Sequence, residues 1–235
     1  MLIKSDRHTR QDIEAWRDYE EIDAAMWYGQ KKAERSMVEI ERFLTAEQKT
    51  CVMTSWGKDS IVMLDLFCKT GVKRPVVYMR LTDRSNPDCD AVRDLFLSEH
   101  SDLDYREEAF KYEEVSKGDK HWKILNDKYG KRVTGIRNDE SKARFLQWCI
   151  NGFASKNSCR PLSLWKSSEV FCYIHKHNLP LCSVYGYLGG GRYRRDQIRT
   201  HSIGGKSGNG MGRSEWEKEY YSDVINRLRN GKEMF

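Results

Sequence analysis

The stretch CVMTSWGKDSIVMLDLFCK at residues 51–69 decides the fold of this chain. Its first part, Cys51 to Ser55, is a short apolar run that predicts a buried strand, and Ser60 to Lys69 is apolar enough for a buried helix. Between them lies a tight turn that contains Gly57. A strand, a glycine turn and a helix in this order are typical of a parallel α/β unit, in which the turn lies where such sheets bind ligands.

The chain after this unit continues to alternate between strands and helices. We expect strands at 76–81, 103–107 and 132–136. We expect helices at 88–100, at 111–130 apart from Gly118, at 138–149 and at 168–177. Because strands that alternate with helices pair in parallel, the sequence predicts an α/β fold with a doubly wound parallel sheet.

The two ends of the chain are helical in their patterning. Residues 1–48 are expected to form a helical extension that packs across the sheet edge or onto a partner, which leaves a homodimer open. Residues 49–213 are expected to form the α/β domain, which ends in a glycine-rich, basic loop at 186–212. Residues 214–235 are expected to add a C-terminal helix, and all three parts to form one compact unit.

The composition describes a folded, well-solvated globule of 235 residues, with 39% hydrophobic and 32% charged residues. No apolar run approaches the ~18 residues that a membrane-spanning helix needs, so we expect no membrane association. The amino terminus has no apolar segment of the kind found in signal peptides, which favours a cytoplasmic location. The net charge of +6 favours an anionic ligand such as a nucleotide, and it permits nucleic acid.

The seven cysteines do not follow the spacing of a metal or disulfide motif. The spacers between Cys149, Cys159, Cys172 and Cys182 are unlike a compact cluster motif, so we do not expect an iron–sulfur cluster. Buried free thiols are the expected state in a reducing compartment.

The turn from Ser55 to Ser60 has the residues that a phosphate site needs. The amino terminus of the following helix offers unpaired amides and partial positive charge to an anion. Gly57 lets the backbone approach phosphate oxygens, Lys58 adds a full charge, and the two serine hydroxyls can donate hydrogen bonds. Asp59 would repel phosphate unless it caps the helix or holds Mg²⁺.

This turn is not a Walker A loop, and its residues also allow a simpler interpretation. A Walker A lysine at 58 would require glycine at 52 and serine or threonine at 59, where the chain has Val52 and Asp59. The alternative is that GKDS is only the solvated start of a helix. Its position at the first strand-to-helix turn favours the phosphate site.

Three segments in order resemble one family of enzymes. SWGKDS at 55–60 resembles the SxGKDS or SGGxDS signature of PP-loop ATP pyrophosphatases, the adenine nucleotide alpha hydrolase-like superfamily. TGIRNDESKAR at 134–144 is similar to the GxRxxES-R element of its phosphoadenosine phosphosulfate (PAPS) reductase branch. CRPLSLWKSSEVFCYIHKHNLP at 159–180 is similar to that branch's RPL segment. The resemblance covers about residues 50–195.

The resemblance implies a set of site residues. The residues expected to bind the nucleotide, ATP or PAPS, are Ser55, Trp56, Gly57, Lys58, Asp59, Ser60, Arg80, Asp83, Gly135 and Arg137. Arg80 and Asp83 would border the adenine and ribose. The residues expected to act in catalysis are Lys58, Asp59, Arg137 and Arg144, with Mg²⁺ offsetting charge on the phosphates.

The two arginines of the second segment have an alternative role. Arg137 and Arg144 lie seven residues apart and could share one anionic group. Alternatively, each forms a surface ion pair with Asp139 or Glu140, and this applies less to Arg137, which lies at a strand's carboxyl end, than to Arg144.

The basic loop carries the residues expected to bind the second substrate, which are Arg192, Arg194, Arg195 and Lys206. Arg199 belongs to the same basic stretch, and Tyr185, Tyr187 and Tyr193 lie between the cations. Aromatic and basic residues in alternation suit base stacking and phosphate contacts. This pattern would suit a nucleic acid as the acceptor, and the resemblance also leaves open sulfate or a sulfur-carrier protein.

One departure from the family pattern bears on the reaction. PAPS reductases of this branch use a carboxy-terminal cysteine as the thiolate nucleophile, and this chain has no cysteine after Cys182. The leading hypothesis is therefore cleavage of ATP at its α-phosphate, with pyrophosphate release and adenylylation of an acceptor, in sulfur activation or nucleic-acid modification. The alternatives are thiol-dependent PAPS reduction and a binding module without turnover.

Overall fold

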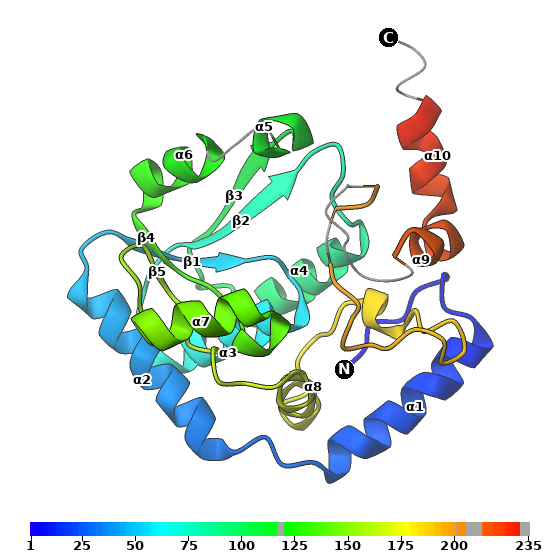
Figure 1. Ribbon diagram of the computed structural model, residues 1–235, viewed down its shortest axis with the longest axis horizontal. Coiled ribbons are helices and arrows are strands. Elements are labelled where there is room, and N and C mark those ends of the chain that lie inside the picture. Colours follow the sequence, from blue (N-terminus) through cyan, green and yellow to red (C-terminus); the bar gives the residue numbers. More distant parts are fainter. Residues whose placement is uncertain (117–119, 201, 205–212, 231–235) are drawn as a thin grey trace.

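A five-stranded parallel sheet lies at the centre of the computed structural model, which describes residues 1–116, 120–200, 202–204 and 213–230 (Figure 1). The strands are β1 (Thr50–Thr54), β2 (Val76–Leu81), β3 (Tyr105–Phe110), β4 (Lys131–Val133) and β5 (Ser158–Cys159). The first helices are α1 (Arg10–Ala25), α2 (Gln30–Ala46), α3 (Lys58–Thr70), α4 (Asp88–Glu99), α5 (Tyr112–Ser116) and α6 (Lys120–Tyr129). The remaining helices are α7 (Lys142–Asn151), α8 (Ser167–Lys176), α9 (Arg213–Tyr220) and α10 (Ser222–Asn230), with the 3₁₀ turns η1 (Asn138–Glu140) and η2 (Ser183–Gly186).

The strand order β3-β2-β1-β4-β5 sets the place where a ligand can bind. Chain order runs outward from β1 in both directions, because β1 pairs in parallel with β2 on one side and with β4 on the other. The order therefore reverses between β1 and β4, and open parallel sheets bind their ligands at such a point, beyond the carboxyl ends of the strands. This arrangement confirms the predicted doubly wound parallel α/β fold.

Helices cover both faces of the sheet, and the hydrophobic cluster on one face is much larger than that on the other. Alternate strand residues point to opposite faces. Val52, Val76 and Val133 join the main core with α2, α3, α4 and α8. Met53 and Val77 face a smaller cluster with α6, which contributes Leu125. The inner strand β1 is buried along its whole length, as expected of a parallel strand with helices on both sides.

The helix after the first strand has well-defined ends. Gly57 is its N-cap, and Gly71 ends it in the left-handed conformation at φ 71°, with its amide bonded to the carbonyl of Cys68 at 3.1 Å. Nine of its residues are buried, which agrees with the apolar sequence between the two glycines.

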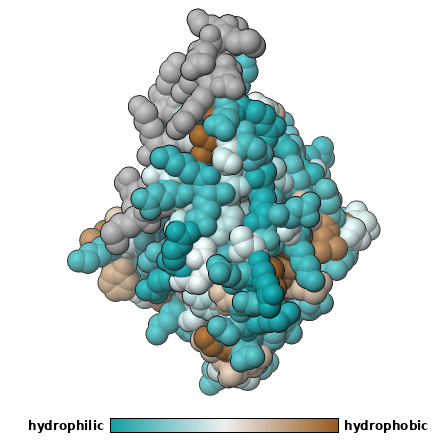
Figure 2. Space-filling view, turned by 90° about the vertical axis from the view of Figure 1, so that its right-hand side faces the viewer, coloured by the Kyte–Doolittle hydropathy of each residue, from teal (hydrophilic) through white to brown (hydrophobic). Residues whose placement is uncertain are grey.

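The N-terminal and C-terminal segments of the chain pack against each other. Ile3 N donates to Leu181 O at 2.8 Å, which joins the amino terminus to the segment after α8. Asp12 on α1 is fully buried and accepts hydrogen bonds from the amides of Leu188 and Gly190 and from the hydroxyl of Tyr220 on α9. The glycine-rich segment is thereby held between the first and the ninth helix. The outer face near α9 and α10 is mainly hydrophilic, with hydrophobic residues in small separate groups (Figure 2).

Some element boundaries differ from the sequence expectations. The third strand runs from 105 to 110 instead of 103–107, and the fourth stops at Val133 instead of Ile136. The two-residue strand β5 was not expected, because it is too short to show a pattern. The expected C-terminal helix is divided at Tyr221, whose buried hydroxyl donates to Asp88 at 2.5 Å and so anchors the break against α4.

Candidate functional site

The exits of β1 and β4 meet at the point where the strand order reverses. A Cβ atom on Gly135, just after β4, would lie 2.9 Å from the carbonyl carbon and oxygen of Asp59 and 3.1 Å from the amide of Ser60. No side chain fits at this distance, so the backbone after β4 lies directly against the first turn of α3. The sequence-predicted phosphate turn and the TGIRNDES segment are therefore in contact, although they lie far apart in the chain.

The phosphate turn, residues 55–60, contains hydrogen bonds between its first and last residues. Ser60 Oγ accepts from Ser55 N at 3.1 Å and lies 2.9 Å from Ser55 Oγ. Trp56 has a φ of 58°, which is uncommon for a residue with a Cβ and is a form of strain that gathers at functional sites. The first amides of α3 have no partner within the helix, and that of Lys58 donates to the hydroxyl of Tyr185 at 3.1 Å.

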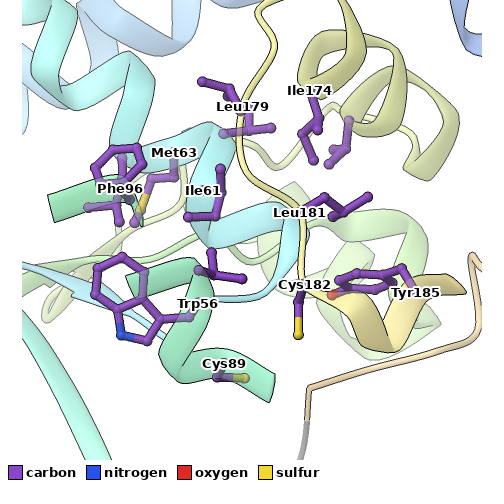
Figure 3. Close-up of a cluster of buried hydrophobic side chains, with 14 of the residues drawn as sticks. Trp56, Ile61, Met63, Cys89, Phe96, Ile174, Leu179, Leu181, Cys182 and Tyr185 are labelled. Carbon is purple, nitrogen blue, oxygen red and sulfur yellow. The ribbon is translucent and has the colours of Figure 1, made fainter. Parts of the chain in front are cut away.

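Trp56 contributes its backbone to this turn and its side chain to the core. Its indole is 1% exposed and packs near Tyr78 and Phe96, with ring centroids 6.3 and 6.2 Å away. Figure 3 shows the ring on the opposite side of the hydrophobic cluster from Tyr185. Because the indole is buried in the core, only the main-chain atoms of Trp56 are left to contact a nucleotide, as the sequence predicts.

A chain of buried charges runs from the phosphate turn to the segment after β4. Lys58 Nζ lies 2.9 Å from Asp59 Oδ2, and Arg137 Nε lies 2.5 Å from Asp59 Oδ1. Arg137 also forms an ion pair with Asp139. The side chains of Lys58 and Arg137 are 1% and 2% exposed, so these contacts are shielded from solvent.

Burial and the neighbouring charges shift the pKa values of both Lys58 and Asp59. Burial lowers the pKa of Lys58, and the nearby carboxylate of Asp59 offsets part of this effect. Burial would raise the pKa of Asp59, but the charges of Lys58 and Arg137 outweigh it and hold the pKa below its usual value. Asp59 is therefore ionised and committed to two cations, which explains how a carboxylate can lie in a phosphate turn.

Glu140 draws two further arginines toward this network. It forms ion pairs with Arg144 on α7 and with Arg199. Arg144 thus adopts the alternative anticipated from the sequence, an ion pair with its neighbour on the helix, whereas Arg137 contacts both Asp59 and Asp139. The guanidinium groups of Arg137 and Arg144 pair with different carboxylates, while the backbone amide of Arg137 also donates to Glu140 at 3.4 Å, so a shared anionic ligand stays a prediction.

The residues expected to border adenine lie at the exit of β2. Arg80 is held by Asp90 at 2.8 and 2.9 Å, and Glu107 lies nearby at 3.5 Å. Asp83 is exposed and accepts from the amide of Tyr112 at 2.9 Å. Their role in nucleotide binding stays a prediction.

The basic loop is less available to a substrate than its sequence indicates. Arg192 is paired with Glu219, and Arg194 with Asp196, both at the surface. Lys206 lies outside the described residues.

Arg195 does not belong with this exposed group. Its guanidinium is 5% exposed and forms two hydrogen bonds with Asp23 on α1, at 2.6 and 2.5 Å. It also lies 4.1 Å from the ring centre of Phe171 on α8. Arg195 was expected to bind the second substrate. Instead, its guanidinium lies inside the protein, where it connects α1 to α8.

Tyr185 and Thr200 are parts of the site that the sequence did not assign to it. Lys58 N donates to the hydroxyl of Tyr185 at 3.1 Å, and a Cβ on Gly57 would lie 2.8 Å from Thr200 Oγ1. Tyr185 is 2% exposed, so it is not free to stack on a base as expected. No local pattern could reveal these contacts, because they join residues more than a hundred positions apart.

The geometry defines a class of α/β protein that presents a glycine turn, a lysine and an arginine at the switch point of a parallel sheet. The chain belongs to the phosphoadenosine phosphosulfate reductase domain family, whose family model matches residues 49–205. This match confirms the resemblance drawn from the sequence and the PP-loop, adenine nucleotide alpha hydrolase-like assignment. A comparison with curated protein sequences finds no match.

Several solved structures are similar over much of their length. PAPS reductase from Candida auris is 15% identical, with 63% of this chain and 81% of that chain covered and a TM-score of 0.44. NMN synthetase from Francisella tularensis is 16% identical, with 65% and 70% covered and a TM-score of 0.46. The U34-tRNA thiolase NcsA from Methanococcus maripaludis, with its [4Fe-4S] cluster, is 15% identical, with 87% and 80% covered and a TM-score of 0.47. At these identities and scores, the likenesses say nothing about ligand or reaction.

The described part of the chain contains no group of three or more His, Cys, Asp or Glu residues arranged to hold a metal ion. All seven cysteines lie in this part and are free thiols. None of the helices within the described ranges is long and apolar enough to cross a membrane.

Proposed function

We propose that this protein binds ATP at the phosphate turn and cleaves it at the α-phosphate, releasing pyrophosphate and adenylylating an acceptor. The observation that carries the proposal is the contact between Gly135 and Asp59, which brings the start of α3, Lys58 and Arg137 together at the switch point of the sheet. The family match, with PAPS as its named nucleotide, supports an adenine nucleotide as the ligand.

The groups at the turn suit a triphosphate better than a single anion. Amides at the start of α3 and the hydroxyls of Ser55 and Ser60 can bind the outer phosphates, which become the leaving pyrophosphate. Arg137 is fixed by two carboxylates and cannot swing away, so its remaining donor edge is preorganised for charge that develops at the phosphate during attack. The acceptor supplies the attacking oxygen and loses its proton as the new bond forms.

Mg²⁺ enters this proposal as part of the substrate, MgATP. Mg²⁺ commonly retains several waters and binds through phosphate oxygens with one or two carboxylates. Asp59 is the carboxylate of the turn, and both its oxygens are already paired with cations. The protein therefore holds the metal through the phosphates, and we assign it no side-chain ligand.

Thiol-dependent reduction of PAPS is the second candidate, and the family match favours it. That reaction needs an accessible thiolate. Burial raises the pKa of Cys51 and of Cys159 to about 12, and Cys149 on α7 is the only exposed thiol of the seven. Five of the seven thiols are buried and Cys68 is half-buried, so we place this reaction second.

The two candidates give different products from different nucleotides. The protein is incubated with Mg²⁺ and α-labelled ATP, and separately with PAPS and reduced thioredoxin. We expect pyrophosphate with labelled AMP or a labelled acceptor, and loss of this product in Lys58→Met, which keeps the length of the buried side chain. Lys31→Met changes an exposed lysine on α2 and is the matched control.

Other outcomes would change the assignment. Sulfite from PAPS would favour the reductase. Saturable nucleic-acid binding with no turnover of either nucleotide would indicate a binding module. ADP with inorganic phosphate would contradict attack at the α-phosphate.

A further inference from the structure

The helix α7 turns its apolar side chains away from the protein. None of its ten residues is buried, and Phe145, Leu146 and Ile150 are 51%, 60% and 81% exposed. Cys149 is exposed as well. Because residues three and four apart share one face of a helix, these four side chains form a single stripe along α7, which we call the apolar stripe. The helix lies in the foreground of Figure 1.

The opposite face of α7 attaches the helix to the rest of the chain. Arg144 pairs with Glu140, and Trp148, one turn further on, packs edge-on against Phe153 with ring centroids 6.4 Å apart. A surface helix normally turns its apolar side to the core and its polar side to water. In α7 this order is reversed, and large apolar side chains that gather on a surface mark an interaction site.

A hollow of about 600 Å³ lies beside the apolar stripe, between η1, the first turn of α7 and the segment before α8. Phe145 belongs to the stripe and also lines the hollow, and Leu164 adds a further apolar side chain to its wall. The stripe and the hollow are therefore continuous. A concave apolar surface of this kind can receive an amphipathic helix of another protein. Asp139 also lines the hollow and pairs with Arg137, so a docked helix lies next to the charge network of the phosphate turn.

The charges around the stripe and the hollow are positive. Lys142 and Lys166 line the hollow and are exposed, and Arg160 donates to the side chain of Gln147 on α7 at 2.9 Å. The two carboxylates of η1 are already paired with arginines. In the part of the chain that the structure describes, no carboxylate pairs with any of these three cations. The surface is therefore complementary to a partner that carries negative charge around an apolar face.

Three other occupants match this surface less well. A second copy of the chain would bring like charges together, because a two-fold interface joins the same patch to itself. A nucleic acid would pair with the lysines, but the aliphatic side chains of Leu146 and Ile150 offer it neither phosphate contacts nor an aromatic ring for stacking. An anionic membrane presents a flat surface, whereas the hollow makes this one concave.

We propose that the apolar stripe and the hollow together form the docking site for an acidic amphipathic helix of a partner protein. The apolar side chains of that helix pack on Phe145, Leu146 and Ile150, and its carboxylates pair with Lys142 and Lys166. The proposal stands on α7 and the hollow, and it does not depend on the reaction at the phosphate turn.

The test uses a synthetic probe, a fluorescein-labelled peptide of about 18 residues, which is long enough to form a helix in water. The peptide has leucine along one face and glutamate along the other, and its binding is followed by fluorescence anisotropy without nucleotide. We expect Ile150→Gln to weaken binding by about 10- to 30-fold, the effect of losing one central apolar contact. The matched control is Ile22→Gln on α1, where the isoleucine is 51% exposed, and it should leave binding unchanged. Both variants should keep the wild-type melting temperature, because both side chains are exposed.

A second peptide, with lysine in place of glutamate, separates charge from hydrophobicity. The wild type should bind this peptide about tenfold more weakly than the acidic one. Lys142→Glu should reduce this difference, because it reverses a charge at the hollow. Lys218→Glu changes an exposed lysine on α9 and should leave the difference unchanged.

Four outcomes would overturn the proposal. The first is equal affinity of Ile150→Gln and Ile22→Gln for the acidic peptide, or a wild type that prefers the lysine peptide. The second is a wild-type dimer in analytical ultracentrifugation that Ile150→Gln dissociates, which would assign the stripe to a second copy. The third is binding of single-stranded RNA or of phosphatidylserine vesicles that Ile150→Gln weakens, without binding of the acidic peptide. The fourth is a lowered melting temperature of Ile150→Gln, which would place this side chain in the packing of the protein itself.

Discussion

Replacing Arg137 with methionine should destabilise the fold through a single buried contact. Its Nε lies 2.5 Å from Asp59 Oδ1, and the two side chains are 2% and 17% exposed. Removing one partner of a buried ion pair costs about 3–5 kcal/mol. Asp59 keeps Lys58 as a partner, and Asp139 is 37% exposed and can be rehydrated, so we expect the lower end, about 3 kcal/mol.

Urea unfolding followed by circular dichroism measures this change. With a slope of roughly 2–3 kcal/mol per molar urea, the midpoint should fall by about 1 M or slightly more. A double-mutant cycle with Asp59→Asn isolates the contact, and we expect a coupling free energy of about 2 kcal/mol. Arg106→Met is the matched control, because Arg106 pairs with Asp104 at a similar distance at the surface, and its midpoint should not change.

The cycle also separates stability from function. If Arg137 serves the phosphates as well, Arg137→Met should weaken ATP binding by about 10- to 150-fold, the effect of losing a charged hydrogen bond. A midpoint for Arg137→Met equal to that of Arg106→Met, or a coupling free energy near zero, would refute the buried network described above.

Three further changes test other parts of the structure. Gly57→Ala places a methyl group 2.8 Å from Thr200 Oγ1 and 3.1 Å from the Tyr185 hydroxyl, so unfolding free energy should fall by about 1–3 kcal/mol in urea titrations, and Thr200→Ala should restore part of it. Arg195→Ala leaves the buried Asp23 unpaired and should lower the unfolding free energy by about 3–5 kcal/mol in the same titrations. Burial would raise the pKa of Asp12, but its hydrogen bonds outweigh this and hold the pKa below its usual value. Its stabilisation is thus full above the unfolded pKa of about 3.9 and is lost as pH falls through the folded pKa, so Asp12→Asn should flatten the acid limb of a stability profile.

Much of the fold could be predicted because local residues encode it. Apolar patterning and the glycine turn predicted a strand at 51–55 and a buried helix at 60–69, within two residues of the observed β1 and α3. The second strand, 76–81, was predicted at its observed bounds for the same reason. The short strand β5 and the division of the last helix at Tyr221 could not be predicted, since each depends on a partner distant in sequence.

The sequence predicted which backbone segments form the candidate site, but only some of the ion pairs between its side chains. The phosphate turn and Gly135 come together because parallel strands bring their carboxyl ends to one edge. Which carboxylate each arginine meets depends on how the helices pack: Arg137 reaches Asp59, whereas Arg195, predicted at a substrate surface, is buried against Asp23.

The sequence by itself determined the parallel α/β class, the place of the glycine turn and membership of the family, because these rest on periodicity and on short motifs within a few turns of chain. Only the tertiary structure decided that the Tyr185 hydroxyl bonds the turn and that Asp59 is paired with a cation on each of its two oxygens. Burial and pairing are set by which distant segments exclude water from a group, and no local pattern of residues contains that information.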